Sequence, residues 1–238
     1  MNRSDILYYP ELDSTNRALR EYLHVAREGF TIVAGKQTAG RGRMGRSFIS
    51  PAGGLYMSLV LKPEKDNFSL ITSAAAVAVT QVIYEKYGAK CGIKWVNDII
   101  KDGKKVCGIL AEAVFEGGKK PEAVILGIGI NLIAPEGGFA KEIKDIATHL
   151  GVCLTADEKI DLATEIANRI LSLYPHPESF VKEYREKSTV LGKEIFVIRG
   201  SEKICGFAKD IDDECGLIVD YGSKTEVLRT GEISVRVK

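Results

Sequence analysis

Three arginines lie close together on a glycine-rich stretch, TAGRGRMGRSFISPAGG, which spans residues 38–54. Arg41, Arg43 and Arg46 are each adjacent to a glycine. Glycine permits unusual backbone dihedrals and close approach of the main chain, and the guanidinium is a planar set of donors that fits a carboxylate or a phosphate. The stretch, called the arginine loop below, therefore predicts a loop that closes around an anion.

The glycines of this loop also match a better-known phosphate-binding pattern, but the context excludes it. Gly40, Gly42 and Gly45 fit G-x-G-x-x-G, yet the dinucleotide-binding form needs a helix that begins at the last glycine. Here Gly45 is followed by RSFISPAGG and then by the apolar run LYMSLVL, which predicts a strand. The Gly-Lys-Ser/Thr of a P-loop is absent as well. Taken alone, the arginine triplet favours a flexible, solvated loop.

Three other short stretches place polar side chains at the ends of apolar segments: DSTN (13–16), KWVNDI (94–99) and GIGINL (127–132). Taken alone, DSTN predicts a helix cap, and the asparagine of GIGINL predicts a turn at the end of a strand. The lysine of KWVNDI is typical of a solvated sheet edge, and its tryptophan is typical of a core. Each stretch by itself favours a structural role.

The faces on which the KWVNDI side chains lie depend on where the strand ends. Alternation along a strand puts Lys94 and Val96 on one face. Trp95 and Asn97 then lie on the other face, unless the strand ends at Trp95.

The elements that must position these motifs follow from hydrophobic periodicity and end signals. Residues 14–29 predict a helix capped by Ser14 or Thr15, and Thr155 with Glu158 predicts a capping box at the start of another helix. The Asp-Gly of KDGKK predicts a hairpin. The other expected elements are a buried helix at 69–87 and strands at 30–37, 55–63, 92–100, 106–115 and 123–132.

The pattern changes after residue 187, where five short β-rich pieces are separated by glycine and charged turns. That arrangement predicts a small closed or half-closed barrel, so we place a domain boundary near Ser188. The preceding part mixes helices with hairpin-linked strands and lacks regular βαβ alternation. It therefore predicts an α+β fold with a mixed or mainly antiparallel sheet and flanking helices.

Composition limits the classes of protein to which this chain can belong. Its 238 residues can bury one sizeable core with a small second unit, and its formal net charge of +1 argues against a general polyanion binder. The five cysteines are odd in number and contain no C-x-x-C, which argues against a disulfide framework and a zinc knuckle. The N-terminus lacks an apolar signal segment and no apolar run is long enough for a bilayer, so we expect a cytoplasmic protein without membrane contact.

In this order, the motifs closely resemble the catalytic domain of biotin protein ligases. The family pattern reads S-T-N, Q-x-x-G-R-G-R-x-G-R…S-P, K-W-x-N-D, G-I-L-x-E and G-I-G-I-N. This chain has matching residues at 14–16, 37–51, 94–98, 108–112 and 127–131. In the tail, LGKEI, GFAKDIDDECGLIV and GEISVR look like the small SH3-like C-terminal domain of that family, so the resemblance covers nearly the whole chain.

The resemblance implies a fold and a reaction. The fold is an α+β catalytic domain of the class II aminoacyl-tRNA synthetase and biotin synthetase type over 1–187, followed by an SH3-like β-barrel over 188–238. In the reaction, biotin's carboxylate attacks the α-phosphorus of ATP, with Mg²⁺, to give biotinyl-5′-AMP and pyrophosphate. A lysine of a biotin carboxyl carrier protein domain then takes the biotin and releases AMP. The family also includes edge-strand homodimers, so a homodimer is an expectation.

Residue roles come from the resemblance as well, position by position. Lys94 and Arg43 are implied as catalytic, with Lys94 between the carboxylate and the α-phosphate. The implied biotin-binding residues are Ser14, Thr15, Asn16, Gln37, Gly40, Arg41, Gly42, Arg43, Lys94 and Gly108. The implied ATP-binding residues are Arg43, Arg46, Phe48, Asn97 and Asn131. The resemblance names no ligands for Mg²⁺.

Two departures and one alternative qualify this interpretation. The family often has tryptophan where this chain has Phe48, which can cover an adenine but lacks the N–H donor. Some members carry an N-terminal winged helix-turn-helix, whereas this chain begins at the ligase domain, so we expect a short form that does not bind DNA. The alternative is a related lipoate or octanoate protein ligase or transferase, against which the G-R-G-R-x-G-R loop favours biotin.

Overall fold

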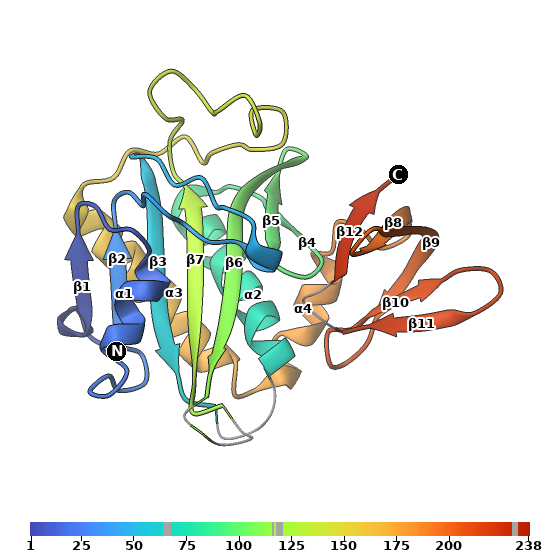
Figure 1. Ribbon diagram of the computed structural model, residues 1–238, viewed down its shortest axis with the longest axis horizontal. Coiled ribbons are helices and arrows are strands. Elements are labelled where there is room, and N and C mark those ends of the chain that lie inside the picture. Colours follow the sequence, from blue (N-terminus) through green and yellow to red (C-terminus); the bar gives the residue numbers. More distant parts are fainter. Residues whose placement is uncertain (64–67, 116, 118–120, 230–232) are drawn as a thin grey trace.

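The computed structural model describes residues 1–238 except 64–67, 116, 118–120 and 230–232, and it contains two β-sheets (Figure 1). The larger sheet has seven strands in the order β1-β2-β3-β7-β6-β5-β4. β1 and β2 pair in parallel, whereas the other neighbours pair antiparallel, so the expected mixed sheet is confirmed. The strands are β1 Ile6–Tyr9, β2 Thr31–Ala34, β3 Gly54–Leu61, β4 Gly92–Lys94, β5 Asp98–Lys101, β6 Lys104–Val114 and β7 Ala123–Asn131.

Helices cover both faces of this sheet. α2 (Phe68–Tyr87) and α3 (Ala156–Leu173) pack on one face, and α1 (Thr15–Glu21) packs on the other (Figure 1). A fourth helix, α4 (Val181–Glu186), and the short 3-10 turns η1 (Arg3–Asp5), η2 (Arg43–Gly45) and η3 (Pro177–Ser179) complete the helical elements of the described residues. Within that described part of the chain, no helix has both the length and the apolar composition needed to cross a bilayer.

The two-sided cover explains why the central strands are apolar throughout. Successive side chains of a strand point to opposite faces. In β2, Val33 enters the core beneath α2 and α3, whereas Ile32 enters the smaller core beneath α1. Leu59 and Val60 of β3 divide in the same way, and every residue of β3 is buried. A run such as LYMSLVL therefore predicts a strand but not which face looks toward a site.

The second sheet follows at the C-terminal end of the chain. Its five strands are antiparallel and lie in the order β11-β10-β9-β8-β12. Each of the five expected β-rich pieces forms one strand, although the first two residues of GEISVR lie outside the described residues. The strands are β8 Glu194–Arg199, β9 Glu202–Ile211, β10 Leu217–Asp220, β11 Thr225–Leu228 and β12 Ile233–Val237.

The strand expected over 92–100 is broken in its middle. β4 ends at Lys94 and β5 begins at Asp98, with a turn between them. The indole Nε1 of Trp95 donates a hydrogen bond of 3.0 Å to the carbonyl of Cys215, which belongs to the C-terminal unit. Simple strand alternation therefore does not extend through this segment, because residues 95–97 form a turn and the indole of Trp95 bonds outside the sheet.

The helix expected over 14–29 is shorter than predicted. α1 ends at Glu21, and the chain continues in hydrogen-bonded turns to Ala26, whose amide bonds the carbonyl of Tyr22 at 2.7 Å. The amide of Gly29 is bonded to the carbonyl of Val60 in β3 at 2.9 Å. This bond places Gly29 beside β3, so the segment after Glu21 does not continue as a helix as far as Gly29.

Candidate functional site

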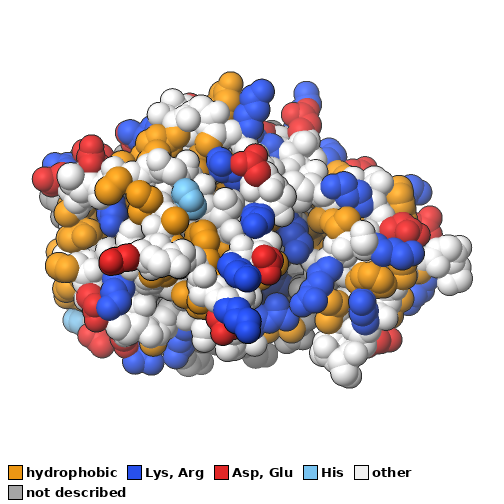
Figure 2. Space-filling model, turned by 90° about the horizontal axis from the view of Figure 1, so that it is seen from above, with side chains coloured by type: hydrophobic (Ala, Val, Ile, Leu, Met, Phe, Trp, Pro, Cys, Tyr) orange, Lys and Arg blue, Asp and Glu red, His pale blue; other side chains and the backbone are white. Residues whose placement is uncertain are grey.

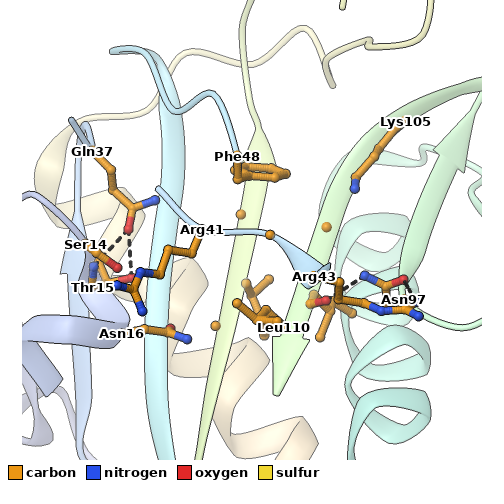
Figure 3. Close-up of a pocket in the computed structure, with 16 residues that line it drawn as sticks. Ser14, Thr15, Asn16, Gln37, Arg41, Arg43, Phe48, Asn97, Lys105 and Leu110 are labelled. Carbon is orange, nitrogen blue, oxygen red and sulfur yellow. Dashed lines mark hydrogen bonds between the residues drawn. The ribbon is translucent and has the colours of Figure 1, made fainter. Parts of the chain in front are cut away.

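A pocket of about 480 Å³, including its open mouth, lies on the α1 side of the larger sheet (Figure 3). β6 and β7 form its floor, the arginine loop crosses it, and the start of α1 and the turn between β4 and β5 stand at its two ends. Five segments of the chain therefore meet here. The lining residues are Ser14, Thr15, Asn16, Gln37, Arg41, Gly42, Arg43, Phe48, Asn97, Lys105, Gly108, Ile109, Leu110, Gly127, Ile128 and Gly129.

Neutral hydrogen-bonding side chains line one end of the pocket (Figure 3). Gln37 Oε1 accepts from the amide of Thr15 at 2.8 Å and from its hydroxyl at 3.1 Å. The hydroxyl of Ser58 lies 2.7 Å from Thr15 Oγ1 and also bonds Asn16 Oδ1. Ser14 stands at the N-cap position of α1 but makes no capping bond with its side chain. The DSTN stretch therefore begins a helix, yet the side chains of Ser14, Thr15 and Asn16 belong to the pocket.

This neutral network continues to a carboxylate. Asn16 Nδ2 donates to Glu112 Oε2 at 2.7 Å, and the other oxygen of Glu112 lies 4.0 Å from Arg41 Nη1. A Cβ added at Gly127 of β7 would lie 2.4 Å from Asn16 Oδ1, which is closer than real contacts allow. A glycine is thus required beneath Asn16 for this end of the pocket to form.

The opposite end carries the cations Arg43 and Lys105 (Figure 3). Arg43 Nη1 donates to Asn97 Oδ1 at 2.6 Å, and Asn97 Nδ2 in turn donates to the carbonyl of Ile109 at 2.8 Å. Burial lowers the pKa of the Arg43 guanidinium, and the carboxylate of Asp98 opposes that shift. Arginine keeps its charge under such conditions, so Asn97 connects a half-buried cation to the floor strand β6.

An aromatic ring lies across two glycines of the floor. Gly108 of β6 and Gly129 of β7 are paired in register. A Cβ added at Gly129 would lie 2.4 Å from Phe48 Cε1, and one added at Gly108 would lie 2.8 Å from Phe48 Cε2. The absence of a side chain at these two positions therefore makes room for the Phe48 ring.

The arginine loop is folded back on itself. The amide of Phe48 bonds the carbonyl of Gly40 at 2.9 Å, and the amide of Gly42 bonds the carbonyl of Arg46 at 2.7 Å. Between these bonds Met44 and Gly45 have φ values of 57° and 70°. A Cβ at Gly40 would lie 2.4 Å from the Phe48 carbonyl oxygen. The glycines therefore close the loop locally, which places two of its arginines in the pocket lining.

Four residues predicted for the site do not line the pocket: Gly40, Arg46, Lys94 and Asn131. Gly40 acts within the loop as described above, and Arg46 is exposed. Asn131 Nδ2 donates to the carbonyl of Thr148 at 2.9 Å, so it holds the segment that follows β7. The roles assigned to these residues from the family resemblance remain predictions.

Lys94 lies one strand away from the lining. It pairs with Asp98 in the ladder of β4 and β5. Burial lowers the pKa of the Lys94 amine; the Asp98 carboxylate opposes that shift, and the charges of Lys105 and Arg236 add to it. Lys94 and Lys105 therefore lie on either side of one carboxylate.

Sequence reasoning missed Lys105, because a local irregularity brings it to the pocket. Strand alternation puts residues three apart on opposite faces, which separates Lys105 from Gly108. In the structure Ile99 pairs with Cys107 but Ile100 pairs with Lys105, so Val106 is an extra residue in β6. This β-bulge returns Lys105 to the face of Gly108. In the sequence, the two adjacent apolar residues Val106 and Cys107, both buried in the structure, are a weak indication of this bulge.

Comparison with known proteins matches two separate parts of the chain, one for the larger sheet and one for the C-terminal sheet. Residues 8–131 match the Biotin/lipoate A/B protein ligase family, and residues 190–236 match the Biotin protein ligase C terminal domain. The chain is similar to the Bifunctional ligase/repressor BirA of Bacillus subtilis, with 43% identity over 188 residues that make up 77% of this chain and 55% of that protein. The chain thus spans little more than half the length of that relative.

Two further relatives are covered more fully. The Biotin--[acetyl-CoA-carboxylase] ligase of Mycobacterium tuberculosis is 31% identical over 220 residues, which cover 87% of this chain and 79% of that protein. Among solved structures, the biotin protein ligase from Aquifex aeolicus in complex with biotin and ATP superimposes with a TM-score of 0.84 at 29% identity. That match covers 98% of this chain and 99% of the other.

Proposed function

Because the chain belongs to the biotin/lipoate A/B protein ligase family, we propose that it activates biotin with ATP and transfers biotin to a lysine of a protein. The intermediate is biotinyl-5′-AMP, and the acceptor is a biotin carboxyl carrier protein domain. Support for the acceptor comes from the Mycobacterium tuberculosis relative, which is a biotin--[acetyl-CoA-carboxylase] ligase. The relative from Aquifex aeolicus supports biotin and ATP as the small substrates.

The observation that carries this proposal is that neutral hydrogen-bonding groups, beside the pair of Arg41 and Glu112, line one end of the pocket and two cations line the other. Biotin has a neutral ureido ring with N–H donors and a carbonyl acceptor, and it has a carboxylate at the far end of its chain. Thr15, Asn16 and Gln37 can pair with the ring, while Arg43 and Lys105 can meet the charged groups. A pocket with a few convergent polar groups and apolar floor residues is typical of such a ligand.

The first step of this reaction brings two anions together, which explains the cationic end. Repulsion between unit charges 4 Å apart is about 4 kcal/mol at an effective dielectric constant of 20. Cations held in place before the reaction remove that barrier and align the reacting atoms. In the view from above, Lys and Arg side chains gather around the hollow between the larger unit and the C-terminal unit (Figure 2). The incoming lysine is the nucleophile of the second step, so little acid–base chemistry is required of the enzyme.

Magnesium enters this proposal as part of the substrate, Mg·ATP. Among the residues that the structure describes, no group of three or more His, Cys, Asp or Glu side chains could hold a metal ion. The carboxylates nearest the pocket, Asp98 and Glu112, are bonded to Lys105 and Asn16. A Mg²⁺ ion retains waters and takes most of its other ligands from the phosphates, so this set of residues fits a metal that arrives with ATP.

The acid substrate is tested by pyrophosphate exchange into ATP, with biotin, lipoate or octanoate as the sole acid. We expect biotin to support exchange at least about a hundredfold better than the other two. The ends of lipoate and octanoate offer no partners for the neutral network, and each buried polar group left unpaired costs about 1–3 kcal/mol. Exchange with lipoate but not with biotin would overturn the substrate assignment and favour the lipoate alternative.

We also propose that residues 188–238 form a second domain that takes part in transfer to the acceptor. The supporting contacts are the bond from Trp95 to Cys215 and the bond of 2.7 Å from Arg185 Nε to the carbonyl of Ile211. The bond from Trp95 connects the C-terminal unit to the turn between β4 and β5. The same turn carries Asn97, which holds Arg43. Cytoplasm is our proposed location, supported by the five cysteines being free.

Deletion of residues 188–238 is therefore expected to abolish transfer of biotin to the acceptor. The Trp95→Phe variant is the milder test, since it keeps an aromatic side chain but removes the N–H donor to Cys215 and part of the buried ring. We expect its transfer rate to fall by roughly tenfold, as one buried hydrogen bond is lost. Biotin incorporation into a carrier domain measures both, with far-UV circular dichroism as the check on folding. Full transfer by a folded truncated chain would exclude a role for this domain.

A further inference from the structure

The turn between β4 and β5 helps to determine where the charge of Arg43 lies. Asn97 of this turn accepts a hydrogen bond of 2.6 Å from Arg43 Nη1, and Figure 3 shows the two side chains meeting at the cationic end of the pocket. A long arginine side chain has many rotamers, so a partner at its head group restricts where that group can be. A residue that fixes the turn therefore also fixes the guanidinium.

Tyr184 of α4 holds this turn at its middle residue. Its hydroxyl donates a hydrogen bond of 3.2 Å to the carbonyl of Val96, and its side chain is fully buried. Burial raises the pKa of the Tyr184 phenol far above its usual range, so the phenol keeps its proton and remains a donor. The charge of Arg43 opposes that shift in pKa, so the phenol and the guanidinium lie within electrostatic reach of each other.

The helix that carries Tyr184 is itself held on two sides. α4 packs against α2, and the next residue, Arg185, donates a hydrogen bond of 2.7 Å to the carbonyl of Ile211 in β9. Figure 1 shows α4 between α2 and the C-terminal sheet. Just after α4, the carbonyl of Lys187 accepts a hydrogen bond of 2.7 Å from the amide of Ile93 in β4. The phenol therefore approaches the turn from a well-supported element.

The end of the turn is joined directly to the floor of the pocket. The amide of Ile109 in β6 bonds the carbonyl of Asn97 at 3.0 Å, and Asn97 Nδ2 donates to the carbonyl of Ile109 at 2.8 Å. Removal of the phenol hydroxyl would leave the carbonyl of Val96 without this donor. The turn would then shift to regain a partner, and the side chain of Asn97 would move with it.

Building on the function proposed above, we propose that Tyr184 is a positioning residue for biotinyl-5′-AMP. Its bond to Val96 holds the turn so that Asn97 keeps Arg43 oriented toward the bound adenylate. Tyr184 does not line the pocket, so its effect on the ligand passes through Arg43. A donor that is already oriented before binding spares the ligand the cost of ordering it. The neutral end of the pocket does not depend on this bond.

The test is a double-mutant cycle of Tyr184→Phe with Arg43→Gly. Calorimetry measures the Kd of a non-hydrolysable analogue of biotinyl-5′-AMP for the parent chain, the two single variants and the double variant. We expect Tyr184→Phe to raise this Kd about three- to tenfold in the parent chain, which is the range for one lost hydrogen bond. In the Arg43→Gly background the same change is expected to alter the Kd by less than about twofold, because the group through which it acts is absent.

The affinity for biotin alone and two control variants separate positioning from a general loss of stability. In Tyr184→Phe the Kd of biotin is expected to stay within about twofold, because the groups that hold its ring are at the other end of the pocket. Tyr174→Phe removes a hydroxyl that donates to Glu28, away from the pocket. Ile166→Val removes one methyl group from the core, and thermal unfolding compares its loss of stability with that of Tyr184→Phe. Neither control is expected to change the Kd of the analogue.

An equal rise in the Kd of the analogue in both backgrounds would show that Tyr184 acts independently of Arg43, and it would overturn the proposal. An unchanged Kd in Tyr184→Phe overturns it as well. So does an equal rise in either control variant, or a loss of affinity for biotin as large as that for the analogue. Failure of the proposed function is recognised separately, because the parent chain then binds neither biotin nor the analogue.

Discussion

An Arg43→Gly variant is expected to make biotinyl-5′-AMP at close to the parent rate and to lose it roughly ten to a hundred times faster. Arg43 is half-buried in the pocket lining and is held by Asn97, so it can contact a bound adenylate without moving far. Loss of one charge-assisted hydrogen bond costs about 1.5–3 kcal/mol, which appears mainly in the dissociation rate. Formation of the adenylate suffers less because other cations still neutralise the reacting groups.

Released biotinyl-5′-AMP acylates exposed lysines without selectivity, and this makes the effect measurable. The variant is mixed with biotin, Mg·ATP and an unrelated lysine-rich protein, which is then probed for biotin. The matched control is Met44→Gly, a glycine substitution at an exposed position of the same loop that lies outside the pocket lining. Equal labelling by both variants would mean that added flexibility of the loop, and not the contact of Arg43, causes the release. Normal adenylate formation with no excess labelling would refute the role of Arg43.

A Lys94→Gln variant is expected to lose adenylate formation while keeping its fold. If Lys94 neutralises the contact between the carboxylate and the α-phosphate, its removal restores a repulsion of about 4 kcal/mol. That value corresponds to a rate roughly a thousandfold lower. Single-turnover formation of biotinyl-5′-AMP measures the rate, and far-UV circular dichroism reports the fold.

The control for this variant is Lys101→Gln in the neighbouring strand, where Lys101 forms an ion pair of 2.8 Å with Asp102 outside the pocket. A near-normal single-turnover rate in Lys94→Gln would contradict the catalytic role. The position of Lys94 makes the comparison with Lys105 informative, since both lie beside Asp98 and only Lys105 is in the lining. If Lys105→Gln abolishes the chemical step and Lys94→Gln does not, the catalytic role belongs to Lys105 and not to Lys94.

Several elements were predictable from short-range sequence because short-range forces determine them. Thr155 and Glu158 form the expected capping box, with the Thr155 amide 2.8 Å from Glu158 Oε2. The Asp-Gly of KDGKK forms the expected hairpin between β5 and β6, with positive φ at Asp102 and Gly103. Turn dihedrals and caps involve residues a few positions apart, so neighbouring letters are sufficient to predict them.

Most of the pocket lining was also predictable, although for a different reason. The arginine loop and the DSTN stretch place polar and charged side chains at the ends of apolar segments. Such side chains do not pack in a hydrophobic core, so they indicate a binding site. The combination and order of the motifs identified the family. Of the residues predicted for the site, ten line the pocket: Ser14, Thr15, Asn16, Gln37, Arg41, Gly42, Arg43, Phe48, Asn97 and Gly108.

The tertiary structure decided which cation lies in the lining and where the strands end. Lys105 reaches the pocket because of a bulge at Val106, which depends on how β5 and β6 pair. The strand before Trp95 stops at Lys94, and the indole of Trp95 bonds Cys215, which is 120 positions along the chain. Periodicity describes one strand at a time, whereas register shifts and contacts between distant segments are determined by packing of the whole chain. The sequence by itself thus determined the family, the loop and the polar groups of the site. Only the folded arrangement decided that Lys105 lines the pocket, whereas Lys94 pairs with Asp98 outside the lining.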